Sequence, residues 1–238
     1  MRAVVPNALT ATRIPIAAAA IVAAVDNQLV LAATLITVGG VSDGVDGWVA
    51  RRLGVSSAFG ALFDYFCDYL CFVVAPWILT RMLLSNEFSI TREVLLALPL
   101  LTGAIRYATN GLTVSARGEE IGALPGLGTV FFAFLSVAAV FLEGDRWLSG
   151  SSFAWTLTGL VVLFSLLMVA PIAYPKLTDI PGASPVVIVL LACMPFAGTR
   201  FLAAIMLAVG LLFAIAGPLL VRNQTHAWPA RDRRSMPR

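Results

Sequence analysis

The sequence has little charge for its 238 residues, because Asp, Glu, Lys and Arg together make up only 12% of it. Hydrophobic residues make up 59%, and the mean hydropathy is +0.91. An average soluble protein carries roughly twice this share of charged residues. A soluble fold of this size could not bury so much apolar surface, so the composition excludes a soluble globular protein and predicts a polytopic membrane protein.

Cysteine and histidine are also scarce. The three cysteines (Cys67, Cys71 and Cys193) do not make a disulfide framework. Cys67 and Cys71 lie one helical turn apart in an apolar stretch without histidine, so we expect buried packing residues rather than a metal pair. The single His226 lies in a polar tail and indicates no histidine-based catalysis.

The small net charge of +3 is unevenly distributed. Residues 222–238 contain five arginines and one aspartate, a sum of +4, so the rest of the chain sums to −1. That apolar remainder holds twelve of the thirteen carboxylates, which is 13 minus the one in the tail. The position of these acids is therefore the feature that needs an explanation.

Stretches of about 20 apolar residues are long enough to span a membrane as helices. We expect one all-α catalytic domain over residues 1–221, a membrane helix bundle, followed by a basic tail over 222–238. The first stretch also resembles a signal peptide, but Thr10 and Arg13 interrupt the apolar core that a signal peptide needs. Polar residues divide the domain into eight candidates: 8–25, 29–50, 57–84, 92–113, 123–142, 152–173, 184–197 and 199–221. The seventh is short, and whether it spans the membrane fully stays open.

Basic residues predict the orientation, because the cytoplasmic loops of membrane proteins are enriched in them. With both termini in the cytoplasm, twelve of the sixteen lysines and arginines fall on that side and four on the other. We therefore expect a multi-pass protein of the cytoplasmic membrane with both termini inside. The basic tail would either lie against anionic headgroups or be solvated.

Four acids lie inside the second and third predicted spans, where an ionised carboxylate costs about 2.5–3.5 kcal/mol. Asp43 and Asp46 are three residues apart, and Asp64 and Asp68 are four apart, so each pair lies on one face of its helix. The connection between the two spans is short, which makes the helices antiparallel neighbours. The four acids should therefore converge near the cytoplasmic surface.

Neither of these two spans provides four matching cations, and carboxylates this close cannot all stay ionised without compensation. Oxygen ligands favour hard ions such as Mg²⁺ or Mn²⁺, and four carboxylates can hold two of them. Two ions suit phosphoryl transfer, because they can stabilise both the attacking and the leaving oxygens. We predict that two divalent cations bind Asp43, Asp46, Asp64 and Asp68.

Small residues flank the acids. Gly44, Gly47, Ala50 and Gly60 could serve close helix packing, or they could let a diphosphate and a base approach the backbone. Arg51 lies at the mouth of the cluster, where a phosphate would meet it.

The string Asp43-x-x-Asp46-Gly47-x-x-Ala50-Arg51, then Gly60-x-x-x-Asp64-x-x-x-Asp68, resembles the signature of the CDP-alcohol phosphotransferase family. Pro6-Asn7-x-x-Thr10-x-x-Arg13 is similar to the opening of many members. The resemblance implies a six-helix core, usually dimeric, here followed by about two further helices. It also implies transfer of a phosphatidyl or phosphoalcohol group from a CDP-linked donor, with release of CMP.

The resemblance further implies the role of each matching residue. Asp43, Asp46 and Asp64 correspond to metal ligands, and Asp68 corresponds to the general base and could also contact a metal. The residues that correspond to the CDP-lipid site are Thr10, Arg13, Asp43, Gly47, Ala50, Arg51 and Gly60.

Residues 72–76, 104–110, 121–125 and 166–176 resemble segments of the phosphatidylserine synthases in this family. Val73, Tyr65 and Thr109 depart from that group, which commonly has Gly, Ser and a basic residue there. The resemblance implies CDP-diacylglycerol as the donor and L-serine as the favoured acceptor. The implied acceptor pocket contains Arg106, Asn110 and Arg117.

Other interpretations stay open. Glycerol 3-phosphate, inositol phosphate or choline could replace serine as the acceptor, and Arg106 could instead cap a helix or reach lipid headgroups. An ion-coupled transporter would also hold acids in the membrane, but it predicts acids dispersed across the membrane depth and repeat symmetry. We expect residues 131–134 to be lipid-facing or interfacial aromatics, and we expect no nucleic-acid partner.

Overall fold

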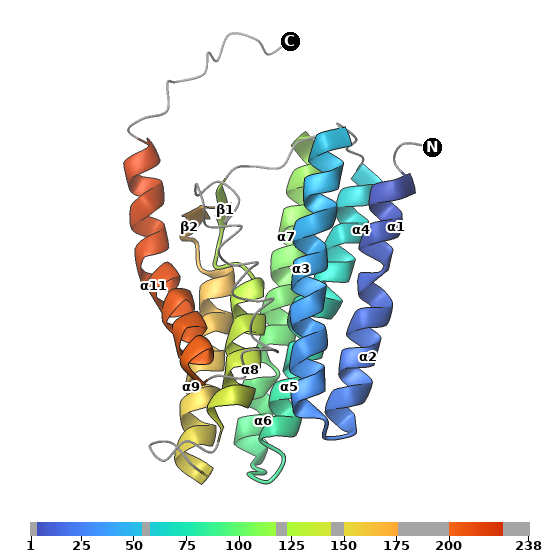
Figure 1. Ribbon diagram of the computed structural model, residues 1–238. Coiled ribbons are helices and arrows are strands. Elements are labelled where there is room, and N and C mark those ends of the chain that lie inside the picture. Colours follow the sequence, from blue (N-terminus) through green and yellow to red (C-terminus); the bar gives the residue numbers. More distant parts are fainter. Residues whose placement is uncertain (1–3, 54–57, 118–122, 144–149, 176–199, 226–238) are drawn as a thin grey trace, which may run out of the picture.

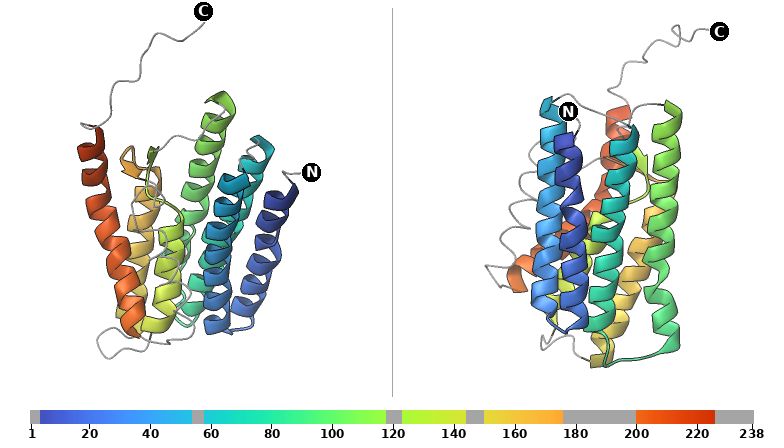
Figure 2. Two further views of the ribbon diagram at one scale, coloured as in Figure 1. Left: turned by 45° about the horizontal axis from the view of Figure 1, so that its top comes forward. Right: turned by 90° about the vertical axis from the view of Figure 1, so that its right-hand side faces the viewer.

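The computed structural model describes residues 4–53, 58–117, 123–143, 150–175 and 200–225. These parts of the chain are almost entirely helical, with one short two-stranded ladder (Figure 1). The helices run along a roughly common axis in all three views (Figures 1 and 2). The prediction of a helical bundle is therefore confirmed.

The helices and strands follow one another in this order: α1 (Val4–Ala11), α2 (Arg13–Val25), α3 (Leu29–Leu53), α4 (Ala58–Tyr69), the π-helical turn η1 (Leu70–Val74), α5 (Ala75–Leu83), α6 (Ile90–Leu96), α7 (Leu98–Arg117), β1 (Ala123–Pro125), α8 (Val130–Leu142), α9 (Gly150–Val169), β2 (Ala173–Pro175) and α11 (Arg200–Thr225). The antiparallel ladder pairs Ala123 with Pro175 and Pro125 with Ala173.

Within the described residues, three helical stretches are long and apolar enough to cross a membrane: Asn7–Val25, Phe59–Leu83 and Gly150–Val169. Shorter apolar helices cover Leu29–Val45, Val130–Leu142 and Ala203–Pro218. The predicted span 184–197 lies outside the described residues, so the total of eight stays a prediction. The predicted span 123–142 begins as a strand rather than a helix, because Pro125 and the positive φ of Gly126 (82°) are incompatible with a helix there.

Three of the breaks between described helices lie next to prolines. Pro15 has no N–H to donate to the carbonyl four residues earlier, which is where α1 ends. Pro76 follows η1, in which the Ala75 N–H donates to the carbonyl of Leu70, five residues earlier. Pro99 lies in the first turn of α7, just after the break from α6. Each break is therefore explained by a missing backbone donor.

The residues of α8 form the centre of the fold. This helix packs against α3, α5, α9 and α11, and every residue from Phe131 to Ala139 is buried. Phe131 stacks on Phe213 of α11 with ring centroids 4.6 Å apart. The prediction that residues 131–134 are lipid-facing is wrong, because a helix that is apolar on all sides can be enclosed by other helices instead.

Small side chains bring α2 and α3 close together. Ala17, Ala20 and Ala24 of α2 are buried, as are Ala32 and Ala33 of α3, and the two helices pack along their length. Alanine lets membrane helices approach closely and gain dispersion energy. This contact determines how the start of α2 lies against α3.

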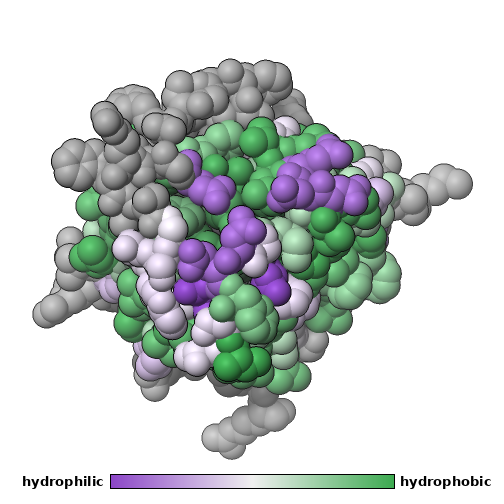
Figure 3. Space-filling model, turned by 90° about the horizontal axis from the view of Figure 1, so that it is seen from below, coloured by the Kyte–Doolittle hydropathy of each residue, from purple (hydrophilic) through white to green (hydrophobic). Residues whose placement is uncertain are grey.

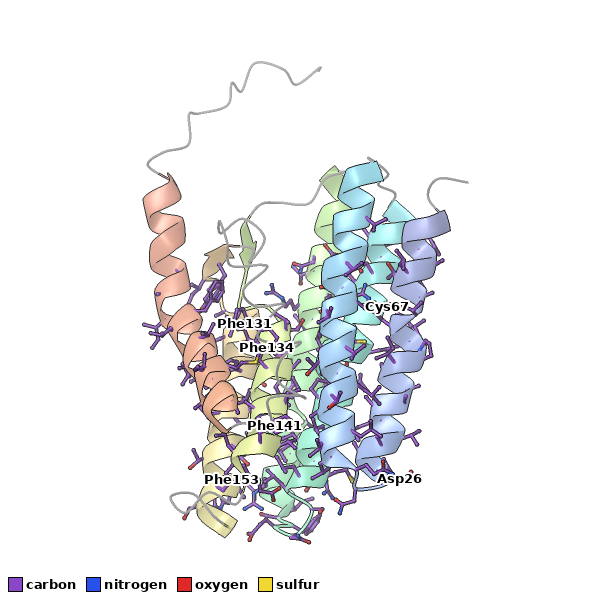
Figure 4. All side chains as sticks on the ribbon, viewed as in Figure 1. Asp26, Cys67, Phe131, Phe134, Phe141 and Phe153 are labelled. Carbon is purple, nitrogen blue, oxygen red and sulfur yellow. The ribbon has the colours of Figure 1, made fainter. Side chains whose placement is uncertain are left out.

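The bundle has two ends that differ in what they carry. The start of α1 and the end of α11 lie at the same end, and Asp26 and Phe153 lie toward the other (Figures 1 and 4). Seen from that second end, hydrophilic side chains gather in patches among apolar ones (Figure 3). An apolar body with polar ends fits a bundle that crosses a bilayer.

Pro218 lies inside α11 and leaves the carbonyl of Ala214 without its helical donor. The hydroxyl of Tyr174, on β2, donates to that carbonyl at 3.0 Å. Gly217 provides the space, because a Cβ there would lie 2.8 Å from the tyrosine ring. The tyrosine thus replaces the lost hydrogen bond and ties α11 to β2.

We expect Tyr174→Phe to lower the free energy of unfolding by about 1 kcal/mol, because it leaves a carbonyl without a donor. Pro218→Ala restores the backbone N–H, so Tyr174→Phe should cost less in that background. The measurement is a double-mutant cycle from thermal unfolding in detergent. An equal cost of Tyr174→Phe in both backgrounds would contradict this role of the hydroxyl.

Candidate metal centre

Three aspartates converge between α3 and α4. One carboxylate oxygen from each of Asp43, Asp64 and Asp68 lies within 4.8 Å of the others. Asp43 comes from α3, and Asp64 and Asp68 lie one turn apart on α4. Their side chains are 37%, 35% and 17% exposed, respectively. The predicted convergence of the two helices' acids is therefore found for these three residues.

Arg13 lies at the centre of this cluster with a side chain that is 0% exposed. Its Nη1 donates to Oδ1 of Asp43 at 2.7 Å and also to Oδ1 of Asp68. Its Nη2 donates to Oδ1 of Asp64. A cation from the first predicted span thus compensates acids in the next two, a pairing that the sequence analysis missed. No local spacing links residue 13 to residues 43, 64 and 68, so only the fold reveals it.

The helix break near Thr12 positions Arg13. Thr12 is the turn residue between α1 and α2, and its hydroxyl donates to the carbonyl of Leu9 at 2.6 Å. The Cys71 thiol donates to the carbonyl of Arg13 at 3.4 Å, which ties the start of α2 to η1. Cys67 and Cys71 are both buried and neither is part of a disulfide, as predicted. Two proline-induced irregularities therefore meet at the residue that holds the acids together.

The donor set suits a divalent cation. Carboxylate oxygens are the ligands that Mg²⁺ and Mn²⁺ prefer, at distances of about 2.0–2.6 Å. Three such oxygens from two helices within 4.8 Å of one another can close around one ion. Asp46 follows Asp43 by three residues on α3, and its side chain lies outside the described part of the chain.

Tyrosines connect the acidic cluster to α7. The ring of Tyr107 on α7 lies 5.7 Å from that of Tyr65 and 6.2 Å from that of Tyr69, both on α4. Its hydroxyl shares a 2.6 Å hydrogen bond with Thr129. The adjacent Arg106 is therefore held on the helix that packs beside the acids.

Arg106 and Asn110 are both buried and lie one turn apart on α7. Arg106 Nη1 donates to the carbonyl oxygen of Met168, in the last turn of α9, at 3.4 Å. The capping role that the sequence left open for Arg106 is therefore present. An acceptor role for the two residues stays a prediction.

The remaining predicted residues lie on α1, α3, α4 and α7. Thr10 is buried on α1, and Gly60 is partly buried on α4. For four others the structure describes the backbone alone: Gly47, Ala50 and Arg51 on α3, and Arg117 at the end of α7.

Gly126 joins β1 to the end of α9. Its N–H donates to the carbonyl of Ile172, and the N–H of Leu127 donates to that of Leu167, both at 2.8 Å. A Cβ at Gly126 would lie 2.0 Å from the Met168 oxygen and 2.9 Å from Nη1 of Arg106. Only glycine fits this position, because a Cβ would clash with the Met168 carbonyl that accepts the hydrogen bond from Arg106.

Known proteins share this sequence over most of its length. Residues 3–216 match the CDP-alcohol phosphatidyltransferase family. A CDP-diacylglycerol–serine O-phosphatidyltransferase of Helicobacter pylori is 30% identical over 87% of this chain and 86% of its own. A protein of the same name from Methanocaldococcus jannaschii is 31% identical over 60% of this chain and 63% of its own. An archaetidylserine synthase of Methanothermobacter thermautotrophicus is 28% identical over 69% and 66%, respectively.

We expect Gly126→Ala to destabilise the protein by about 2 kcal/mol or more, through the clash with Met168 and the strained φ. Gly159→Ala on α9 is the matched control, because its Cβ would meet nothing within 4 Å. That change should be neutral or stabilising by up to about 1 kcal/mol. Thermal unfolding of both variants in detergent makes the comparison, and equal midpoints would show that the loop tolerates a Cβ.

Proposed function

The chain belongs to the CDP-alcohol phosphatidyltransferase family, and we propose that it transfers the phosphatidyl group of CDP-diacylglycerol to the hydroxyl of L-serine, releasing CMP. Relatives named for the serine reaction match this chain over most of its length. The observation that supports the chemistry is the convergence of Asp43, Asp64 and Asp68 on two packed helices. A site for phosphoryl transfer needs this concentration of oxygen ligands.

In this proposal Asp43, Asp46 and Asp64 hold two divalent ions, Mg²⁺ or Mn²⁺, with Asp68 beside them or sharing a metal. When bound, the ions would stabilise the charge of the diphosphate and of the departing CMP. The set of residues proposed to bind the CDP-lipid comprises Thr10, Arg13, Asp43, Gly47, Ala50, Arg51 and Gly60. The acyl chains of the bound CDP-lipid would remain in the bilayer.

Asp68 would accept the proton of the serine hydroxyl, since an alcohol at neutral pH is a weak nucleophile. The serine oxygen then forms a bond to the lipid-linked phosphorus, and the bond from that phosphorus to the oxygen bridging to CMP breaks. Asp68 is the least exposed of the three clustered acids. Because less water reaches a shielded carboxylate, water competes less with the serine hydroxyl for this base.

Arg106, Asn110 and Arg117 would form the acceptor pocket. Serine carries a carboxylate, and a buried guanidinium supplies the opposite charge and several N–H donors. Arg106 is buried on the helix that packs against α4, whose Asp64 and Asp68 belong to the cluster. Acceptors with a phosphate would need the same kind of charge, so a panel of alcohols is required to identify the substrate.

We also propose that the site faces the cytoplasm, that both termini are cytoplasmic and that the enzyme is a homodimer. The start of α1 and the end of α11 at one end of the bundle support an even number of spans (Figure 1). Clustering of the acids at one place favours an enzyme over a transporter, whose relay would distribute acids across the membrane.

We expect Asp64→Asn and Asp68→Asn each to reduce CMP release by at least about 100-fold, because they remove a metal ligand and the general base. Asp26→Asn is the control, since Asp26 is exposed between α2 and α3, toward the other end of the bundle (Figure 4). The measurement is CMP released from CDP-diacylglycerol with Mn²⁺ and serine by purified protein. Full activity of either cluster variant would refute the assignment.

We expect Arg106→Lys to raise the KM for serine by about 10-fold or more, because lysine cannot reproduce a planar, bidentate contact with a carboxylate. The KM for CDP-diacylglycerol should change little. Wild-type protein is compared on serine, glycerol 3-phosphate, inositol phosphate and choline in the same assay. A larger effect on the KM for the donor, or no preference for serine, would contradict the proposed pocket.

A further inference from the structure

We propose that Arg13 is an exchangeable internal cation. Its guanidinium would neutralise the acidic cluster while no metal ion is bound, leave the carboxylates when divalent ions bind, and then pair with the diphosphate of the donor. The inference rests on the proposed metal centre and adds a defined order of binding to it.

Arg13 and a metal ion would compete for the same space. The Nη atoms of Arg13 donate to Oδ1 of Asp43, Asp64 and Asp68. An ion held by these three carboxylates would need their oxygens at about 2.0–2.6 Å. The guanidinium, centred among the three side chains, occupies the volume in which such an ion would lie. The Arg13 guanidinium and a metal ion therefore cannot occupy the cluster at the same time in this arrangement.

The charge of Arg13 also places it in competition with a divalent ion. Three carboxylates and one guanidinium sum to −2, so Arg13 compensates the cluster only in part. A divalent ion brings more charge to the same oxygens, and it would repel a guanidinium in contact with them. Arg13 can therefore keep its contacts with the carboxylates when no metal ion is bound and lose them when a metal ion binds.

Arg13 needs a new partner once it leaves the carboxylates. Its side chain is completely buried, so its charge needs another anion once the carboxylates are taken. A diphosphate bound at the metal ions would bring anionic oxygens to the same place, and arginine binds such groups with paired hydrogen bonds. Arg13 also directly follows the break between α1 and α2, where the helix can adjust. Metal and donor should therefore bind with positive coupling, and metal should bind first.

The decisive measurement is metal affinity rather than activity. If Arg13 competes with metal, Arg13→Gln should bind Mn²⁺ on the order of 10-fold more tightly than wild type, within the usual range of such couplings. If Arg13 only positions the carboxylates, the same variant should bind Mn²⁺ more weakly. Titration of purified protein with Mn²⁺, followed by electron paramagnetic resonance of the free ion, gives both dissociation constants.

Stability provides a second readout. Arg13→Gln should unfold at a lower temperature than wild type in EDTA, because the acids then repel one another, and the difference should shrink in saturating Mn²⁺. Arg92→Gln is the matched control, since Arg92 is also buried, at 3% exposure, and its guanidinium lies 4.8 Å from the centroid of the Trp155 ring rather than among the aspartates. Its effect on stability should be the same with and without Mn²⁺, and its Mn²⁺ affinity should equal that of wild type.

Arg13→Lys tests the proposal where the glutamine variant fails to fold. Lysine keeps the charge but cannot contact three carboxylates through a planar fork, so Mn²⁺ should bind about 3-fold more tightly than to wild type. Unchanged or weaker Mn²⁺ binding by the Arg13 variants overturns the exchange but leaves the metal centre standing. Wild-type protein that binds no divalent ion would instead refute the proposed metal centre itself.

Discussion

The structure depends on how like charges are held together inside an apolar bundle. Asp43, Asp64 and Asp68 approach within 4.8 Å of one another, and in a medium of low dielectric constant they would repel or become protonated without a cation. Arg13 supplies that cation from a third helix. The packing of α2 against α3, through small alanines, is therefore also a condition for the acidic site, because it brings the arginine to the carboxylates.

The second constraint is that every backbone carbonyl in a membrane needs a donor. A proline has no N–H, so it leaves one carbonyl without its helical donor. In this protein the resulting irregularities lie beside functional or structural contacts. The break before Pro15 positions Arg13. The thiol of Cys71, in the π-helical turn before Pro76, donates a hydrogen bond to the Arg13 carbonyl. Within α11 the carbonyl freed by Pro218 accepts a hydrogen bond from the Tyr174 hydroxyl, which attaches α11 to β2. Departures from ideal helix geometry thus determine the position of the polar residues.

Apolar stretches of about 20 residues were enough to predict the helical class. Local spacing, with the short connection between the two helices, was enough to predict the convergence of the acids, because Asp64 and Asp68 must share a face of one helix. It could not predict Arg13 as their partner, since that contact depends on how three helices pack. The lipid-facing prediction for residues 131–134 was wrong for the same reason: hydrophobicity alone cannot distinguish contact with lipid from contact with α11. The side chains of Asp46, Arg51 and Arg117 lie outside the described structure, so their assignments stay predictions.

Residue 73 shows why a departure from a family pattern need not alter the site. Val73 stands in η1 where the serine-specific group commonly has glycine, and two methyl groups there would keep a neighbouring helix away. The structure places Gly103 of α7 opposite, and a Cβ on that residue would lie 2.9 Å from Val73 Cγ2. The small residue is thus supplied by the other helix, and the close contact is kept. Because Tyr107 follows Gly103 by about one turn, α7 stays close enough to α4 for the Tyr107 ring to contact those of Tyr65 and Tyr69.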